Sequence, residues 1–178
     1  MKRVLKIIGI VFLIIVLAFV GLYLYADNKP AIYKWYRSDI ETGGKIEEKY
    51  LGDGSYETEK LTIKAPDPIK KYTIYYTKDM TDSEGTYPMV LVVNGTGFKA
   101  TKYEPQFAQL ASWGYIVVGT QDKGTGSGET TIQMLNDMME QNNNKESILY
   151  QKIDIENIGV TGFSQGGAAT IRSAYMYD

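Results

Sequence analysis

The longest apolar segment of the chain runs from residue 7 to residue 26, IIGIVFLIIVLAFVGLYLYA, and contains no charged residue. A helix of about 20 residues is roughly 30 Å long, which matches the hydrocarbon core of a bilayer. Lys2, Arg3 and Lys6 precede the segment, and positive charge tends to stay on the cytoplasmic side. We therefore predict that residues 1–26 form a single-pass anchor in the cell membrane and that the remaining chain is extracytoplasmic.

A cleaved secretory signal is the alternative interpretation of this segment. Such signals have a shorter apolar core, of about 7–15 residues, followed by small residues at the cleavage site. Here the bulky Tyr23 and Tyr25 stand near the end of the segment. This favours an uncleaved anchor, with secretion after cleavage as the alternative.

The pattern changes twice after the apolar segment. Polar residues and glycines without clear periodicity fill residues 27–54, which predicts a stalk or linker. Beyond them, 56–63 and 72–77 are rich in β-branched and aromatic residues and predict an antiparallel pair of strands. The apolar run 89–93 is of strand length, so both of its faces should be buried.

Strand and helix patterns alternate along the rest of the chain. The predicted elements are helix 102–113, strand 115–119, helix 130–140, strand 155–162 and helix 166–177. The polar run Gln141-Asn142-Asn143-Asn144-Lys145 is predicted to be a solvated loop. A hairpin followed by this alternation predicts an α/β domain over residues 55–178, with a mostly parallel sheet and flanking helices.

Composition narrows the function classes. The net charge is −2 and charges of both signs are interleaved after the apolar segment, so no basic face for nucleic acid is expected. The absence of cysteine excludes disulfides, thiolate metal sites and a cysteine nucleophile. Histidine is absent too, so we expect neither a zinc site nor any other metal or cofactor.

The motif Gly162-Phe163-Ser164-Gln165-Gly166 is the strongest candidate for chemistry. It follows the apolar strand pattern Ile158-Gly159-Val160-Thr161 and precedes a helix pattern that begins with small residues. A nucleophile elbow needs this context, because so tight a turn leaves no room for side chains beside the serine. The helix would then direct its N–H groups at developing negative charge. The alternative is a glycine turn whose serine only caps the helix.

A second glycine-bearing turn, Asn94-Gly95-Thr96-Gly97-Phe98, follows the apolar run 89–93. Glycines allow backbone N–H groups to face a reaction centre, so this turn is a candidate for one side of an oxyanion hole. An ordinary turn at the end of a strand is the alternative.

Several segments occur in an order typical of one superfamily. They are Gly54-Ser55-Tyr56, Thr73-Ile74-Tyr75-Tyr76, the strand and loop from Val90 to Phe98, the stretch from Leu110 to Val118, and the GFSQGG elbow. In this order the chain resembles the α/β-hydrolase superfamily, and most of all its cutinase-like polyester hydrolases and the chlorophyllase and dienelactone hydrolase relatives. The resemblance covers roughly residues 50–178.

The resemblance implies a serine hydrolase that cleaves a small-molecule or polymeric carboxylic ester through an acyl-enzyme. Carried over residue by residue, it implies Ser164 as the nucleophile between the elbow glycines Gly162 and Gly166. It also implies the backbone N–H groups of Gln165 and Phe98 as oxyanion donors, with Thr96 in place of Phe98 as the alternative.

The chain departs from the superfamily in having no histidine to act as the base. In this fold the acid and the histidine follow the elbow along the chain. We therefore expect residues 55–178 to be the N-terminal part of a hydrolase domain, and the 178 residues to be inactive alone. A lysine base, Lys99 or Lys123, is one alternative. A non-catalytic, membrane-anchored binding protein that retains the fold is the other.

Overall fold

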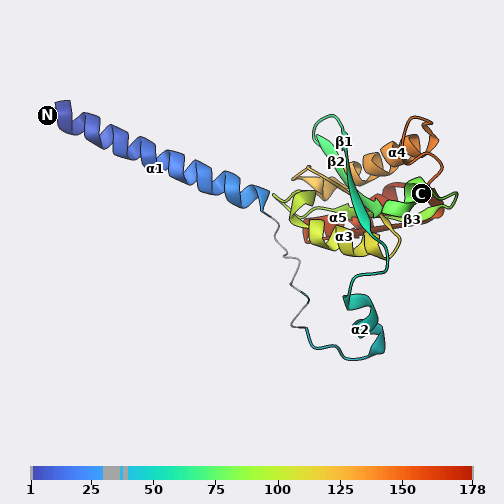
Figure 1. Cartoon of the computed structure of the whole chain (residues 1–178). Coiled ribbons are helices and arrows are strands. Elements are labelled where there is room, and N and C mark those ends of the chain that lie inside the picture. The colour runs from blue at the N-terminus through green and yellow to red at the C-terminus, as the bar shows by residue number, and fades with distance from the viewer. Residues whose placement is uncertain (1, 30–36, 38–39, 178) are drawn as a thin grey trace.

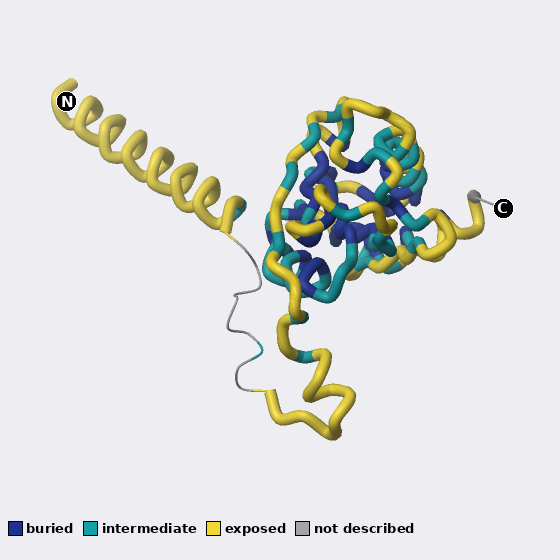
Figure 2. The backbone as a smooth tube through the Cα atoms, turned by 45° about the vertical axis from the view of Figure 1, so that its right-hand side comes forward, coloured by how far each residue is buried: buried dark blue, intermediate teal, exposed yellow. Residues whose placement is uncertain are grey.

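The computed structural model describes residues 2–29, residue 37 and residues 40–177. Helix α1, Lys2–Asn28, projects from an α/β domain and has no buried residue (Figures 1 and 2). Among the described residues it is the one helix long and apolar enough to cross a membrane. This fits a membrane anchor or a signal sequence.

The predicted stalk contains a short helix that its polar pattern did not reveal. This helix, α2, spans Lys45–Leu51 and has no buried residue. Residues 30–36 and 38–39 of the predicted stalk lie outside the described residues. The stalk boundaries 27–54 therefore stay a prediction.

The domain is built on a mixed five-stranded sheet in the order β1-β2-β4-β3-β5. The strands are β1 Thr58–Lys64, β2 Lys71–Thr77, β3 Tyr87–Val93, β4 Ile116–Thr120 and β5 Ile153–Gly162. Strand β2 is antiparallel to both β1 and β4, whereas β3 is parallel to both β4 and β5. The α/β fold class predicted from the sequence is confirmed.

Helices cover both faces of this sheet. They are α3 Glu104–Ser112, α4 Glu129–Asn143 and α5 Gln165–Tyr177. On one face, Met134 and Met138 of α4 pack in a core with Leu91, and α5 joins the same core. On the other face, Phe107 of α3 packs with Val117. Strands β3 and β4 are therefore enclosed between two helical layers, as their continuous apolar runs predict.

The prediction of a loop at residues 141–145 is wrong for its first three residues, because α4 continues to Asn143. The backbone carbonyl of Asn142 accepts a hydrogen bond from the Gln151 amide at 2.9 Å. Its side-chain Oδ1 accepts another from the Ile153 amide at 3.0 Å. These contacts with the segment that enters β5 stabilise a last helical turn that the local polarity disfavours.

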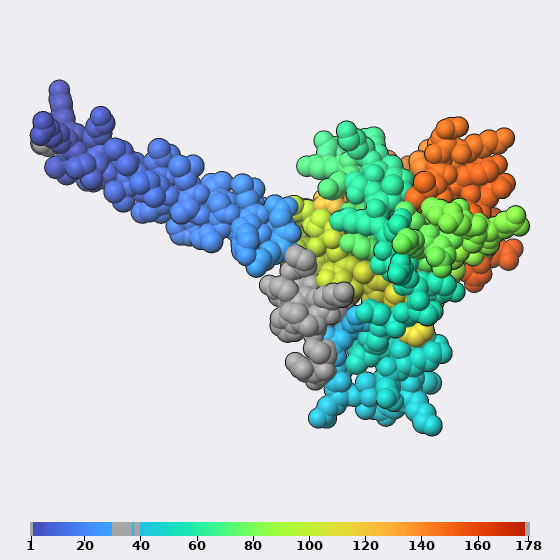
Figure 3. All heavy atoms as spheres, viewed as in Figure 1, coloured from blue at the N-terminus to red at the C-terminus, as the bar shows by residue number. Residues whose placement is uncertain are grey.

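The carboxyl ends of β3, β4 and β5 meet at one edge of the sheet, because these three strands are parallel. That edge carries the loops after β3 and β4 and the serine turn after β5. Figure 3 shows the end of α1 against the domain. There, Asp27 of α1 pairs with Lys99 and Lys123, and the Ala26 carbonyl accepts a hydrogen bond from Lys102; all three lysines lie on these loops.

Strand β5 is the last strand in the order, and its outer side is open in the described structure. Ile155 and Val160 of β5 are 63% and 41% exposed, and Ile171 of α5 is 73% exposed. They line an apolar groove of about 770 Å³. An exposed apolar edge of this kind is prone to pair with other chains.

Candidate active site

Ser164 lies between the end of β5 at Gly162 and the start of α5 at Gln165. Its φ angle is 54°, in the left-handed region that residues other than glycine seldom adopt. A backbone of this kind is less stable than a relaxed one by about 1–3 kcal/mol and persists only when its surroundings impose it. The Ser164 side chain is exposed.

The two flanking glycines are required by close backbone packing. A Cβ on Gly162 would lie 2.3 Å from the carbonyl group of Gly166. A Cβ on Gly166 would lie 2.1 Å from the carbonyl oxygen of Val93. Both distances are shorter than real Cβ contacts. A side chain at Gly162 would push the start of α5 away from the end of β5, and a side chain at Gly166 would push the turn away from β3. Steric crowding therefore requires glycine at both positions, as the motif predicts.

Hydrogen bonds fasten the serine turn to the central strand and to itself. The Phe163 amide donates to the Val93 carbonyl at 3.2 Å, and the Gly166 amide donates to the Phe163 carbonyl at 2.9 Å. The Gln165 amide stands at the first position of α5, where a helical N–H group has no acceptor within the helix. The partial positive charge of the helix N-terminus is thus presented beside Ser164.

The loop after β3 lies against the serine turn. A Cβ on Gly95 would lie 3.5 Å from the Cβ of Ser164 and 3.0 Å from the Phe163 ring. The structure therefore brings together the two segments that the sequence analysis singled out separately.

Some backbone N–H groups of the loop after β3 already donate hydrogen bonds, and another does not. The Phe98 amide donates to the Gly95 carbonyl at 3.0 Å, and the Gly97 amide donates to the Lys123 carbonyl at 2.9 Å. An oxyanion would have to compete with Gly95 for the Phe98 N–H group. The Thr96 amide donates no hydrogen bond to the residues that the structure describes. Both remain candidates for the second oxyanion donor.

Asn94 is a supporting residue to which the sequence analysis gave no role. It is completely buried, and its side-chain amide donates to the carbonyl groups of Thr120 at 2.9 Å and Asp122 at 2.7 Å. Its own carbonyl accepts a hydrogen bond from the Thr125 hydroxyl at 2.8 Å. Asn94 thereby holds the loop after β3 to the loop after β4. A polar residue directly after a buried strand was the available signal.

Three aromatic rings gather beside Ser164. Phe98 and Phe163 are nearly parallel, with ring centroids 6.5 Å apart and an interplanar angle of 11°. They are 36% and 57% exposed, whereas Tyr103, 6.1 Å from Phe163, is buried. Burial raises the pKa of Tyr103, although a hydrogen bond from the Gly95 amide to its hydroxyl acts in the opposite direction. The surface next to the serine is therefore apolar and aromatic.

The two candidate lysine bases are both paired with one carboxylate. Lys99 Nζ lies 2.6 Å from an oxygen of Asp27, and Lys123 Nζ lies 2.9 Å from the other. The hydrogen bond with Asp27 raises the pKa of Lys123, which favours the ammonium form. An ammonium group cannot accept the serine proton. Among the described residues no group of three or more histidine, cysteine or acidic side chains is placed to hold a metal.

Comparison with known proteins agrees with this architecture. A family described as PET hydrolase-like matches residues 46–177, which include the whole sheet and the serine turn. No curated protein matches the chain. The matched family is one of cutinase-like and polyester hydrolases with the α/β-hydrolase fold, so the resemblance inferred from the sequence is confirmed. The chain therefore belongs to the PET hydrolase-like family, a family of hydrolases that act on esters.

Proposed function

We propose that Ser164 is the nucleophile of a serine hydrolase that cleaves carboxylic esters through an acyl-enzyme. The observation that carries this proposal is the left-handed backbone at Ser164, held by glycines that have no room for a side chain. A serine that only caps a helix needs no such backbone, because N-cap residues adopt the extended region. A strained and exposed serine at a helix N-terminus is the arrangement expected of a nucleophile.

The reaction follows from the groups around the serine. Ser164 Oγ attacks the ester carbonyl carbon, and the alcohol leaves when the tetrahedral intermediate collapses to the acyl-enzyme. The Gln165 amide donates to the oxyanion from one side. The loop after β3 supplies the second donor, Phe98 on the strength of the resemblance, with Thr96 as the alternative. Each such donor contributes about 10²–10³ in rate.

The proton acceptor is the missing part of this mechanism. None of the 178 residues is a histidine, and Asp27 pairs with Lys99 and Lys123. We therefore expect the base to come from outside these residues and turnover by the 178 residues to be far below that of a complete triad. Oxyanion donors and binding alone leave about 10³–10⁴ over the reaction in water.

Acyl transfer from an activated ester tests this proposal. The full chain in neutral detergent is incubated with 4-nitrophenyl acetate, and peptides are analysed by mass spectrometry. We expect an acetyl group to form slowly on Ser164, because 4-nitrophenolate is a good leaving group and the oxyanion donors remain. The acetyl group should then persist, because hydrolysis of the unactivated serine ester also lacks a base. Ser164→Ala should abolish the adduct, and Ser55→Ala, a change at another exposed serine, should leave it. Absence of an adduct at Ser164 would refute the assignment of the nucleophile.

The structure also offers an observation that favours a non-catalytic binding protein. The Phe98 amide is already hydrogen-bonded within its own loop, and the sequence has no histidine. In that case the exposed rings of Phe98 and Phe163 would bind an apolar ligand without chemistry. The acyl-transfer experiment separates the two, since a binding protein acquires no adduct above the background of other serines.

We further propose that residues 1–26 are an uncleaved membrane anchor, that residues 27–54 are a stalk, and that the domain from residue 55 lies outside the cytoplasm. The basic N-terminus and the helix of 27 residues support this topology. Sodium carbonate extraction and protease accessibility of intact cells test it. Release of a shorter chain into the medium would favour secretion instead.

A further inference from the structure

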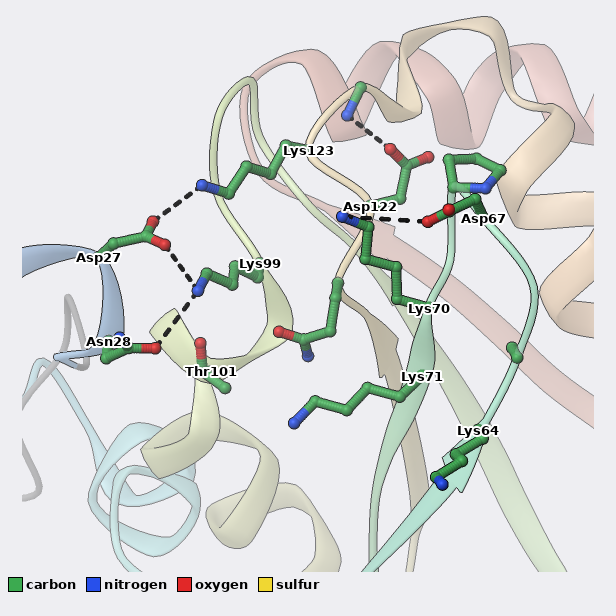
Figure 4. A pocket seen from close by; sticks show the side chains of 14 residues that line it. Asp27, Asn28, Lys64, Asp67, Lys70, Lys71, Lys99, Thr101, Asp122 and Lys123 are labelled. Carbon is green, nitrogen blue, oxygen red and sulfur yellow. Dashed lines mark hydrogen bonds and ion pairs between the residues drawn. The ribbon is translucent and has the colours of Figure 1, made fainter. Parts of the chain in front are cut away.

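Lysines gather around a pocket between the end of α1 and the turn that joins β1 to β2. The pocket has a volume of about 990 Å³ and is open to solvent. Figure 4 shows the side chains of Lys99 and Lys123 on the side of α1, and those of Lys70 and Lys71 across from them. We propose that this pocket binds the phosphate-bearing headgroup of an anionic phospholipid at the membrane surface. The inference rests on the membrane anchor proposed above.

The charge of the lining favours an anion. Five lysines and three aspartates line the pocket, giving a net charge of +2. The lysines are Lys64, Lys70, Lys71, Lys99 and Lys123, and the aspartates are Asp27, Asp67 and Asp122.

Two of the aspartates do little to neutralise the lysines. Asp122 is buried and its carboxylate accepts hydrogen bonds from the Thr130 hydroxyl at 2.5 Å and the Gly124 amide at 2.8 Å. These hydrogen bonds within the domain stabilise the Asp122 carboxylate, so it does not depend on the lysines as partners. Asp67 is exposed and lies 3.9 Å from Lys70 Nζ, a distance typical of a loose surface pair.

Lys64 and Lys71 supply a second, independent argument. They are partners in the register of β1 and β2, so two like charges stand directly opposite each other on neighbouring strands. This arrangement destabilises a sheet unless an anion lies between the charges. Neither lysine forms an ion pair with the residues that the structure describes. A phosphate group bound by both ammonium groups would remove the repulsion.

The end of α1 sets the height of the pocket relative to the membrane. Asp27 pairs with Lys99 and Lys123, and the buried Lys102 donates from Nζ to the carbonyl groups of Ala26 and, at 2.7 Å, Lys29. The residues directly after the apolar segment are thus joined to the pocket wall. The headgroup layer extends about 5–8 Å beyond the hydrocarbon core. If Ala26 ends the membrane span, Asp27 and the pocket beside it lie at headgroup depth.

This placement favours a phospholipid over another anion. At an anionic membrane surface, each lysine strengthens the binding of a protein to the lipid about five-fold. The same contribution from Lys64 and Lys71 to a lipid in the pocket amounts to about 25-fold in affinity. Lys99 and Lys123 lie on the loops after β3 and β4, at the edge of the sheet that carries Ser164. A bound headgroup would therefore hold the edge that carries Ser164 toward the membrane.

Lipid binding to the full chain tests the proposal. The 178-residue chain in neutral detergent is titrated with dioleoyl-phosphatidylglycerol or dioleoyl-phosphatidylcholine, and bound lipid is counted by native mass spectrometry. We expect at least ten-fold tighter binding of phosphatidylglycerol. The double variant K64Q/K71Q should lose about 25-fold in its affinity for phosphatidylglycerol and nothing for phosphatidylcholine. Equal affinity for the two lipids, or an unchanged preference in K64Q/K71Q, would overturn the proposal.

Matched variants and a competitor make the result specific. K78Q/K145Q removes two exposed lysines outside the pocket and should stay within two-fold of the parent. K64R/K71R keeps the charge and should retain the preference for phosphatidylglycerol. The thermal melt of K64Q/K71Q should be no lower than that of the parent, because the substitution removes a repulsion. Displacement of the lipid by inorganic phosphate at concentrations equal to that of the lipid would reassign the site to free phosphate and refute the lipid.

A separate measurement isolates the anchor on which the inference depends. Carbonate extraction of the full chain from phosphatidylcholine vesicles reports the anchor without any anionic lipid. A chain that is extracted but still binds phosphatidylglycerol in detergent would overturn the anchor and leave the headgroup pocket standing. A chain that is retained but shows no lipid preference would overturn the pocket alone.

Discussion

Replacing Gly166 by alanine places a methyl group against the backbone of the central strand. The new Cβ would lie 2.1 Å from the carbonyl oxygen of Val93 and 2.6 Å from that of Asn94, whereas ordinary contacts begin at 3.4 Å. The serine turn must therefore move away from β3 by more than 1 Å. That movement would break the 3.2 Å hydrogen bond from the Phe163 amide to Val93.

The size of the effect follows from what obstructs the methyl group. Overpacking of a core costs about 1–3 kcal/mol when side chains can adjust, and more when they cannot. Here the obstructing atoms belong to the backbone of a buried strand, and a hydrogen bond worth about 1 kcal/mol is lost as well. We expect Gly166→Ala to lower the free energy of unfolding by about 3–5 kcal/mol.

Gly159 provides a matched control seven positions earlier on β5. A Cβ on Gly159 meets no atom within 4 Å, and alanine suits its strand backbone. Gly159→Ala should change stability by no more than about 0.5 kcal/mol. Urea unfolding of the full chain, followed by tryptophan fluorescence, compares the two variants. With a slope of about 1–3 kcal/mol per molar urea, the midpoint of Gly166→Ala should fall by at least about 1 M. Equal midpoints for the two variants would refute the steric argument for the elbow.

Three further predictions follow from the same structure. Ser164→Gly should be more stable than Ser164→Ala by about 1 kcal/mol in urea, because glycine relaxes the left-handed backbone that alanine retains; the reverse order would contradict the strain. Asn94→Ala should lower stability by about 2–4 kcal/mol, because two buried carbonyl groups lose their donor, whereas the exposed Asn157→Ala should stay within about 0.5 kcal/mol; equal effects would contradict the anchoring role. Burial and the neighbouring Asp137 raise the pKa of Tyr72 above its usual value of 10.0, so folding keeps the phenol neutral. The contribution of Tyr72 to the free energy of unfolding should be fully present below pH 10 and should fall as the pH rises above 10, because the unfolded phenol then ionises. Tyr72→Phe should flatten this decline in urea unfolding measured against pH; a profile unchanged by the substitution would contradict the assignment.

The elements that the sequence predicted are those whose signal is local. Strand β4 is a continuous apolar run whose residues are all buried, and the serine turn combines a strand pattern, two glycines and a helix pattern within a few residues. Periodicity and turn chemistry are sufficient in both cases. The end of α4 was predicted wrongly because its last turn is stabilised by contacts with Gln151 and Ile153, which local polarity does not encode.

The hydrogen bonds and ion pairs around the candidate site could not be predicted from the sequence. The hydrogen bond from Phe98 to Gly95 depends on how the loop turns after β3, and residue types alone do not specify it. The pairing of Asp27 with Lys99 and Lys123 joins residues that are far apart along the chain. Likewise, the opposition of Lys64 and Lys71 depends on strand register. Such contacts depend on the tertiary structure, so the pattern of residues along the chain does not predict them.

The serine turn depends more on the central strand than on the strand that leads into it. Strand β5 has an open outer side and several exposed apolar residues. An edge strand of this kind would by itself support the strained backbone of Ser164 only weakly. The contacts that define the turn instead reach β3, where Val93 accepts the Phe163 amide and leaves no space for a side chain at Gly166. Asn94, the next residue, fixes the loop on the other side of the site. Because β3 is enclosed by β4, β5 and two helical layers, Ser164 and the loop after β3 are supported by the same buried strand. The position of Ser164 relative to the loop after β3 is therefore set by contacts with β3 and with the loop after β4.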